Sequence, residues 1–82
     1  MNLSDMKEGL RYIVTHDSKN KEFQVGDRIR LENGDMLNIT AGGFMEAKYL
    51  TEATEGMTVE VNKEWVERQR LKLQQQLAAL ES

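Results

Sequence analysis

The stretch Gly26–Glu46, GDRIRLENGDMLNITAGGFME, decides the fold. Within it, Arg28–Glu32 alternates charged and apolar residues, and Met36–Thr40 alternates in much the same way. A period of two is typical of strands that are buried on one side. The residues between them, Asn33 and Gly34, form the strongest short hairpin signal, because both central positions of a type I′ turn need a positive φ. The sequence therefore predicts an antiparallel hairpin.

The alternation also predicts which side of this hairpin is buried. Ile29 and Leu31 are expected to face the same side as Leu37 and Ile39. Solvent or a partner would then meet the other side, which carries Arg28, Arg30, Glu32, Asn38 and Thr40.

Three further segments are predicted as strands, because they are rich in β-branched or aromatic residues or alternate with period two. They are Leu10–Thr15, Glu22–Val25 and Met57–Val61. A short helical turn is expected near Ser4, which is a suitable N-cap, and another over Ala47–Glu55. Gly42 and Gly43 interrupt the pattern. They favour a bend that lets the sheet curl closed, and the alternative is a close approach of a ligand or another backbone.

The last segment changes character. From Asn62, a good N-cap, the chain runs to Leu80 without Gly or Pro and with many strong helix formers, so a helix of about five turns is predicted. Its apolar stripe consists of Val66, Leu73, Leu77 and Leu80. Two arrangements explain the stripe. Either the C-terminal half forms the interface of a homo-oligomer, most simply a dimer, or the helix folds back over the sheet.

These elements predict a mainly β (α+β) protein. The expected architecture is a small antiparallel barrel, SH3-like or OB-like, or a strongly bent sheet, with a long C-terminal helix. Residues 1–61 would form the barrel domain, including its short N-terminal helical turn. Residues 62–82 would form the helix, packed on the barrel through its first half.

Composition and charge limit the function. The 82 residues suffice for one domain with a small core, and the chain has no cysteine, so disulfides and thiolate metal sites are excluded. The net charge is −3, and residues 1–62 carry eleven acids against seven bases. This acidic balance disfavours binding to a nucleic-acid backbone. No apolar run is long enough for a membrane span and no signal peptide is evident, so a cytoplasmic protein without a membrane partner is expected.

The sequence offers no catalytic constellation. His16, Asp17 and Ser18 are the residue types of a hydrolase triad, but direct neighbours cannot generally adopt its geometry, and a polar turn is the simpler interpretation. A single histidine excludes a multi-histidine metal site, and the acids lack calcium-loop spacing. We therefore expect no enzyme activity, no catalytic residues, no metal and no cofactor.

One group of residues is a candidate binding site. Aromatic side chains near arginines can stack a base or nucleotide, as small barrels often do. The candidate group consists of Arg28, Arg30, Gly42, Gly43, Phe44 and Tyr49. The simpler interpretation, which the pattern favours, places Phe44 and Tyr49 in the core.

The pattern VGDRIRLENGD, then AGGFMEA, then VEVNKEWVERQ before a Leu/Gln helix resembles small proteins encoded by bacteriophages and prophages. The resemblance covers about residues 7–70 and brings no catalytic or binding motif. It implies an accessory protein in the host cytoplasm that acts by stoichiometric binding, for example by inhibiting or sequestering a host protein. The alternatives are a small ligand as the partner and a small nucleic-acid or nucleotide-binding barrel.

Overall fold

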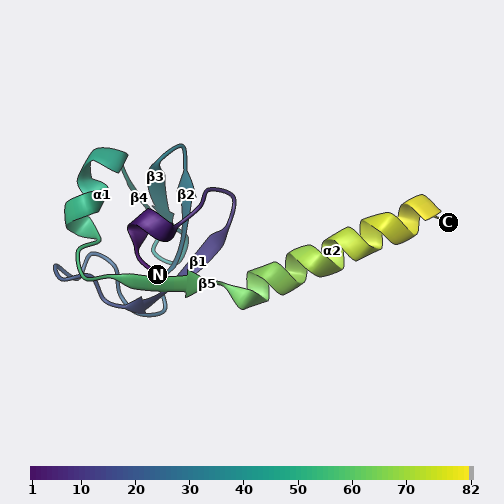
Figure 1. Ribbon diagram of the computed structural model, residues 1–82, viewed down its shortest axis with the longest axis horizontal. Helices are drawn as coiled ribbons and strands as arrows, with labels where there is room; N and C mark the ends of the chain where they lie inside the picture. The colour runs from purple at the N-terminus through teal and green to yellow at the C-terminus, as the bar shows by residue number, and fades with distance from the viewer. Residues whose placement is uncertain (82) are drawn as a thin grey trace.

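The structure, a computed structural model, describes residues 1–81; Ser82, the last residue of the predicted helical segment, lies outside the described residues. The elements follow one another as η1 (Leu3–Asp5), β1 (Arg11–His16), β2 (Arg28–Glu32), β3 (Asp35–Asn38), β4 (Gly43–Met45), α1 (Ala47–Ala53), β5 (Thr58–Val61) and α2 (Lys63–Glu81). The chain is thus an α+β protein built around one antiparallel five-stranded sheet. Figure 1 shows α2 leaving the folded sheet region as a separate arm.

The predicted hairpin is confirmed. β2 and β3 pair antiparallel, with Glu32 opposite Asp35, so the turn consists of two residues. Asn33 has φ 53° and Gly34 has φ 83°, the positive values that a type I′ turn requires. The Gly34 N–H also donates a 2.7 Å hydrogen bond to Oε1 of Glu8, which joins the turn to the N-terminal segment.

The prediction of which β3 residues face the core is wrong. Because the turn has only two residues, Leu31 lies opposite Met36 and Ile29 lies opposite Asn38, and directly paired residues share one face of a sheet. Met36 and Asn38 are therefore buried with Ile29. Leu37 lies on the other face, and Ile39, which follows the strand, is 40% exposed. A shift of one residue thus exchanges the two faces of β3.

The expected barrel is also wrong, because the sheet is open. Its five strands lie in the order β4-β3-β2-β1-β5, all neighbouring pairs are antiparallel, and the two end strands do not pair with each other. Two local features account for the lack of pairing between the end strands. β4 is only three residues long, and the outer edge of β5 is occupied where Val59 N–H donates to the Met1 carbonyl at 2.8 Å.

One face of the sheet is buried and forms the core. Tyr12, Val14, Ile29, Met36 and Val59 contribute to it from the strands, each at most 2% exposed. The covering layer consists of Met6, Phe23, Leu50, Ala53 and Met57, with Leu50 and Ala53 coming from α1. The hydroxyl of buried Tyr12 accepts a 2.8 Å hydrogen bond from the Lys7 N–H, so its polar end is satisfied.

The predicted strand at Glu22–Val25 is wrong. The segment is a bend followed by the start of a turn, in which Phe23 is buried and Val25 is 62% exposed. Its backbone groups are satisfied locally. The Phe23 N–H donates to Ser18 Oγ at 3.0 Å, and the Phe23 carbonyl accepts from the Ser18 N–H at 2.8 Å. These bonds replace the ladder that a strand would need.

The helix α2 meets the rest of the molecule only near its start. The side chain of Asn62 caps it, accepting a 3.3 Å hydrogen bond from the Trp65 N–H. Trp65 and Val66 are half-buried, and every residue from 67 to 80 is exposed. The molecule is accordingly elongated, with principal extents of 52 × 22 × 22 Å (Figure 1). None of the helices within residues 1–81 has the length and apolar character needed to cross a membrane.

Candidate binding face on the sheet

The face of the sheet that is turned away from the core is the candidate functional site; we call it the outer face. Strand register builds it, because directly paired residues share a side. Arg11 of β1 lies opposite Arg30 of β2, Arg30 lies opposite Leu37 of β3, and Leu37 lies opposite Phe44 of β4. A row of two arginines, a leucine and a phenylalanine therefore crosses four of the five strands.

A second row runs beside the first. Ile13 lies opposite Arg28 on one side and Glu60 on the other. Ile39 continues this row beyond β3, since its N–H donates to the Arg28 carbonyl at 2.7 Å. The outer face thus places three arginines among four apolar side chains: Ile13, Leu37, Ile39 and Phe44.

Phe44 is the most exposed apolar side chain of these rows, at 63%. It lies on the short edge strand β4, where only Leu37 flanks it within the sheet. The turn before it is made by Gly42, whose φ is 74° and whose N–H donates to the Asn38 carbonyl at 2.8 Å. Gly42 thus completes the turn, and Gly43 begins the edge strand that presents Phe44. The preferred prediction that Phe44 and Tyr49 are core residues is wrong, since Tyr49 is 56% exposed.

The arginines of the outer face have few acidic partners. Within residues 1–81, neither the Arg11 nor the Arg28 guanidinium forms an ion pair, and Arg30 forms one, from Nη2 to Oε2 of Glu32 at 3.4 Å. The Nε of Arg30 is buried and has no hydrogen-bond partner in the described part of the chain. Like charges directly opposite each other, as Arg11 and Arg30 are, destabilise a strand pair. Glu32 offsets this repulsion at Arg30 only, since Arg11 has no acidic partner in the described part of the chain.

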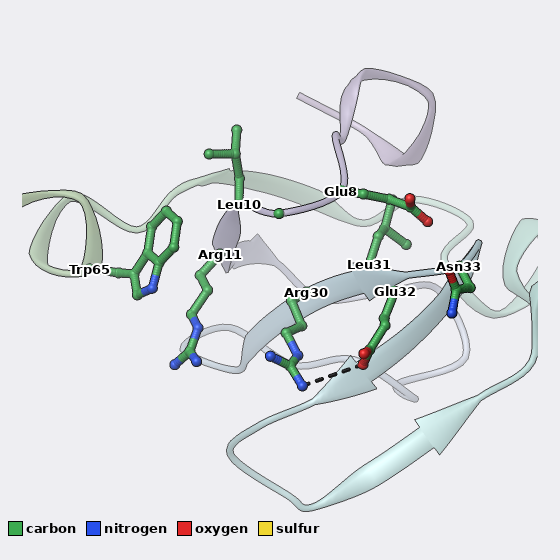
Figure 2. Close-up of a pocket in the computed structure, with 9 residues that line it drawn as sticks. Glu8, Leu10, Arg11, Arg30, Leu31, Glu32, Asn33 and Trp65 are labelled. Atoms are coloured by element: carbon green, nitrogen blue, oxygen red, sulfur yellow. Dashed lines mark hydrogen bonds and ion pairs between the residues drawn. The ribbon is translucent and has the colours of Figure 1, made fainter. Parts of the chain in front are cut away.

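Figure 2 shows Arg11 and Arg30, but not Arg28, at one end of the sheet, around a groove of about 220 Å³. Arg11, Arg30 and Glu32 extend to the same side of the strands, whereas Leu10 points the opposite way. Trp65, from the first turn of α2, lies next to Arg11 and closes one end of the groove. The start of the helix therefore contributes an aromatic side chain to the site.

A second groove, of about 330 Å³, lies over the opposite end of the first row. Its lining includes Arg11, Arg30, Leu37, Ile39, Gly43 and Phe44. The two grooves share Arg11 and Arg30, so these two guanidiniums stand at the centre of the candidate site, with Trp65 on one side and Phe44 on the other.

The structure brings together most of the site residues that the sequence predicted. Arg28, Arg30 and Phe44 lie on the outer face, and Gly42 and Gly43 border it. Tyr49 does not belong to this group. It lies on α1, which packs against the core, and its ring is next to Lys48, whose Nζ is 5.0 Å from the ring centroid.

The sequence did not predict several residues of the site, among them Ile13, Arg11, Leu37, Ile39 and Trp65. Arg11 stands at the start of a correctly predicted strand, but its position opposite Arg30 depends on a long-range register. Leu37 and Ile39 were assigned to the wrong face. The sequence predicts that the first half of the helix packs on the sheet domain, but it does not predict that Trp65 lies beside Arg11.

The predicted polar turn at His16-Asp17-Ser18 is only partly right, because His16 is the last residue of β1 and Asp17 and Ser18 begin the polar loop that follows it. The carboxylate of Asp17 accepts hydrogen bonds from the Val25 N–H at 2.7 Å and from Lys21 Nζ at 3.0 Å. The Val25 N–H, followed by the Lys21 side chain, lowers the pKa of Asp17. Ser18 Oγ donates to Asn20 Oδ1 at 3.0 Å and accepts from the Phe23 N–H. All of these contacts hold the loop before β2 in place.

No protein-family model, no curated protein and no solved structure matches this chain. The geometry of the outer face is therefore the basis for the functional argument.

Proposed function

We propose that this chain is a non-enzymatic binding protein that holds a protein partner in a stoichiometric complex on its outer face. The observation that carries the proposal is Phe44, 63% exposed on the edge of a row that continues into Leu37 and two arginines. Aromatic side chains and arginines are the residues most enriched at the energetic centres of protein interfaces. The resemblance to phage and prophage proteins extends the proposal to an accessory protein that inhibits or sequesters a host protein.

The chemistry of the face specifies the partner segment. Phe44, Leu37 and Ile39 offer an apolar surface beside Arg11 and Arg30. A carboxylate placed between the two guanidiniums would offset their mutual repulsion and could accept charge-assisted hydrogen bonds from them. The fitting segment is therefore an apolar side chain close to an aspartate or glutamate.

Binding of single-stranded nucleic acid or a nucleotide is the second candidate. It is favoured by the row from Phe44 to Arg11, since a base can stack on an aromatic ring while arginines bind phosphate. The charge of the face weighs against it. Across the outer face three arginines, Arg11, Arg28 and Arg30, are balanced by three acids, Glu32, Asp35 and Glu60. A surface without net positive charge gains little from releasing counterions.

The test is capture from an extract of the native host, with the wild type and two single variants as immobilised baits. Phe44→Ala should lose the captured protein, whereas Tyr49→Ala should retain it. Tyr49 is the matched control, because it is also an exposed aromatic residue but lies on α1. The captured protein should recombine with the wild type at one partner per chain in light scattering.

Two results would overturn the proposal. Capture that survives Phe44→Ala combined with Arg30→Ala would place the interface elsewhere on the molecule. Absorbance at 260 nm in the purified protein that nuclease removes, and that Phe44→Ala also removes, would establish the nucleic-acid candidate instead.

A further inference from the structure

We propose that α2 is a self-association surface that pairs antiparallel with α2 of a second copy of this chain. The inference goes beyond the proposed function, because it concerns a different face and does not require the sheet to have a partner. It rests on a helix of 19 residues of which only the first turn meets the rest of the molecule.

The helix carries an apolar stripe whose three leucines are not covered by any part of the described chain. At 3.6 residues per turn, Val66, Leu73, Leu77 and Leu80 fall within about 60° of one another around the axis. Leu73 is 60% exposed, Leu77 is 58% exposed and Leu80 is 83% exposed. The alternative in which the helix folds back and buries these leucines against the sheet does not hold in this structure. A stripe of this kind on one helix fits the matching stripe of another.

The distribution of charge points to a second copy as the occupant. Within the part of α2 whose side chains are described, the ion pairs lie in the first half of the helix, Glu64 with Arg68 at 3.7 Å and Glu67 with Arg70 at 3.4 Å. The eight residues 73–80, LQQQLAAL, contain no charged side chain, although 30% of the whole chain is charged. Two copies of such a segment can face each other without like-charge repulsion. The segment has no charged group that a charged partner could pair with.

The shape of the molecule favours the antiparallel direction. Packed helices lie about 8–10 Å apart, whereas the molecule is 22 Å across perpendicular to its long axis. A parallel pair would bring two sheet regions of that width together at one end and would place Arg70 next to its own copy. An antiparallel pair sets Leu73 of one chain against Leu77 of the other. It also leaves the two sheet regions at opposite ends (Figure 1).

The contact is small, which determines its expected strength. An overlap of about thirteen residues per chain is well below the roughly 1,200–2,000 Å² of a standard stable interface. We therefore expect a dimer that forms reversibly in the micromolar range. Its consequence is bivalency, since two outer faces in one assembly would bind a repetitive or dimeric partner more tightly than one face can.

The test is sedimentation equilibrium of the wild type and two variants over a range of concentrations. The mass of the wild type should rise from that of one 9.4 kDa chain towards twice that value. Leu73→Glu with Leu77→Glu should raise the dissociation constant by at least about 100-fold, because charges would enter the apolar contact. Leu71→Glu is the matched control. It makes the same substitution on the same helix, but Leu71 lies on the side opposite the stripe, and its variant should dimerise like the wild type.

The direction of pairing is tested with a spin label on Lys63→Cys, which is unique because the chain has no cysteine. Antiparallel pairing separates the two labels by about 36 Å along the helix axis, from a rise of 1.5 Å per residue, whereas parallel pairing brings them to about 10 Å.

The proposal is overturned by any of three outcomes. The first is a wild type that remains one chain at all micromolar concentrations, and the second is equal dissociation by Leu71→Glu. The third is a short distance between the labels. If the wild type is monomeric and captures a host protein, and the Leu73→Glu, Leu77→Glu variant no longer captures it, the stripe is instead the binding surface for that protein. Circular dichroism on each variant verifies that the sheet is intact, which the exposure of residues 67–80 leads us to expect.

Discussion

The sheet and the C-terminal helix both carry large apolar side chains, but the sheet buries them and the helix exposes them. In the sheet, Ile29 and Met36 are fully buried, and α1 adds Leu50 at 3% exposure. In α2, Leu77 is 58% exposed and Leu80 is 83% exposed, although their surroundings in sequence are no more polar. Burial in the first region stabilises the chain on its own. In the second region, the same apolar area becomes useful only when a partner covers it.

The largest expected effect comes from comparing one truncation in each region. Ile29→Ala removes a fully buried side chain and should lower the free energy of unfolding by about 2–5 kcal/mol. Leu77→Ala removes as many atoms from an exposed position and should change it by less than about 0.5 kcal/mol in dilute solution. Urea denaturation followed by circular dichroism measures both. Equal losses in the two variants would mean that α2 packs against the sheet, contrary to the structure.

A smaller effect is expected at the hairpin turn. Gly34→Val forces a β-branched residue to a φ of 83° and should cost about 1–3 kcal/mol. Space is not the cause, because a Cβ at residue 34 would only meet Ala47 Cβ at 3.8 Å, an ordinary contact. Gly34→Asn is the matched variant, since asparagine tolerates the left-handed region, and it should lose clearly less. Similar losses for both variants would show that the backbone conformation is not the source.

The hairpin could be predicted from the sequence because its cause is local. Asn33 and Gly34 define the turn by their own conformational preferences. The buried face of β3 could not be predicted from alternation alone. Leu37 with Ile39 and Met36 with Asn38 both have a period of two, and the first pair is the more apolar. Only the two-residue turn count, carried through the register, selects the second pair.

Contacts between distant segments decide that the sheet stays open, and they also build part of the site. The outer edge of β5 is occupied by the backbone of Met1, and the Glu22–Val25 segment is held by Ser18 rather than by a strand. Alternation within one segment cannot reveal either contact. The same holds for Arg11. Its candidate role comes from lying opposite Arg30, a partner 19 positions away in the sequence.

The smallest predicted effect is a pH dependence of stability that comes from Asp17. This residue lies in a loop of the sheet region, so the effect should be absent from α2. The pKa of Asp17 is lowered from its ordinary value of 3.8, first by the Val25 N–H and then by Lys21. A carboxylate with a lowered pKa in the folded state stabilises that state above its unfolded pKa. The stabilisation is lost as the pH falls through the folded pKa. Asp17→Asn should therefore be less stable than the wild type at neutral pH, and the difference should close below pH 3.8.

Urea denaturation of both proteins at a series of pH values from about 7 to about 2 measures this difference. Lys21→Met separates the two causes. It removes the contact from Lys21 Nζ at 3.0 Å but leaves the 2.7 Å bond from the Val25 N–H to Asp17 Oδ1. Because the backbone bond is the larger cause, most of the pH dependence should survive in Lys21→Met. If that variant instead behaves like Asp17→Asn, the ion pair and not the loop backbone accounts for the stabilisation. The loop would then depend on a surface charge pair that salt screens, and adding salt to the wild type should reproduce the loss.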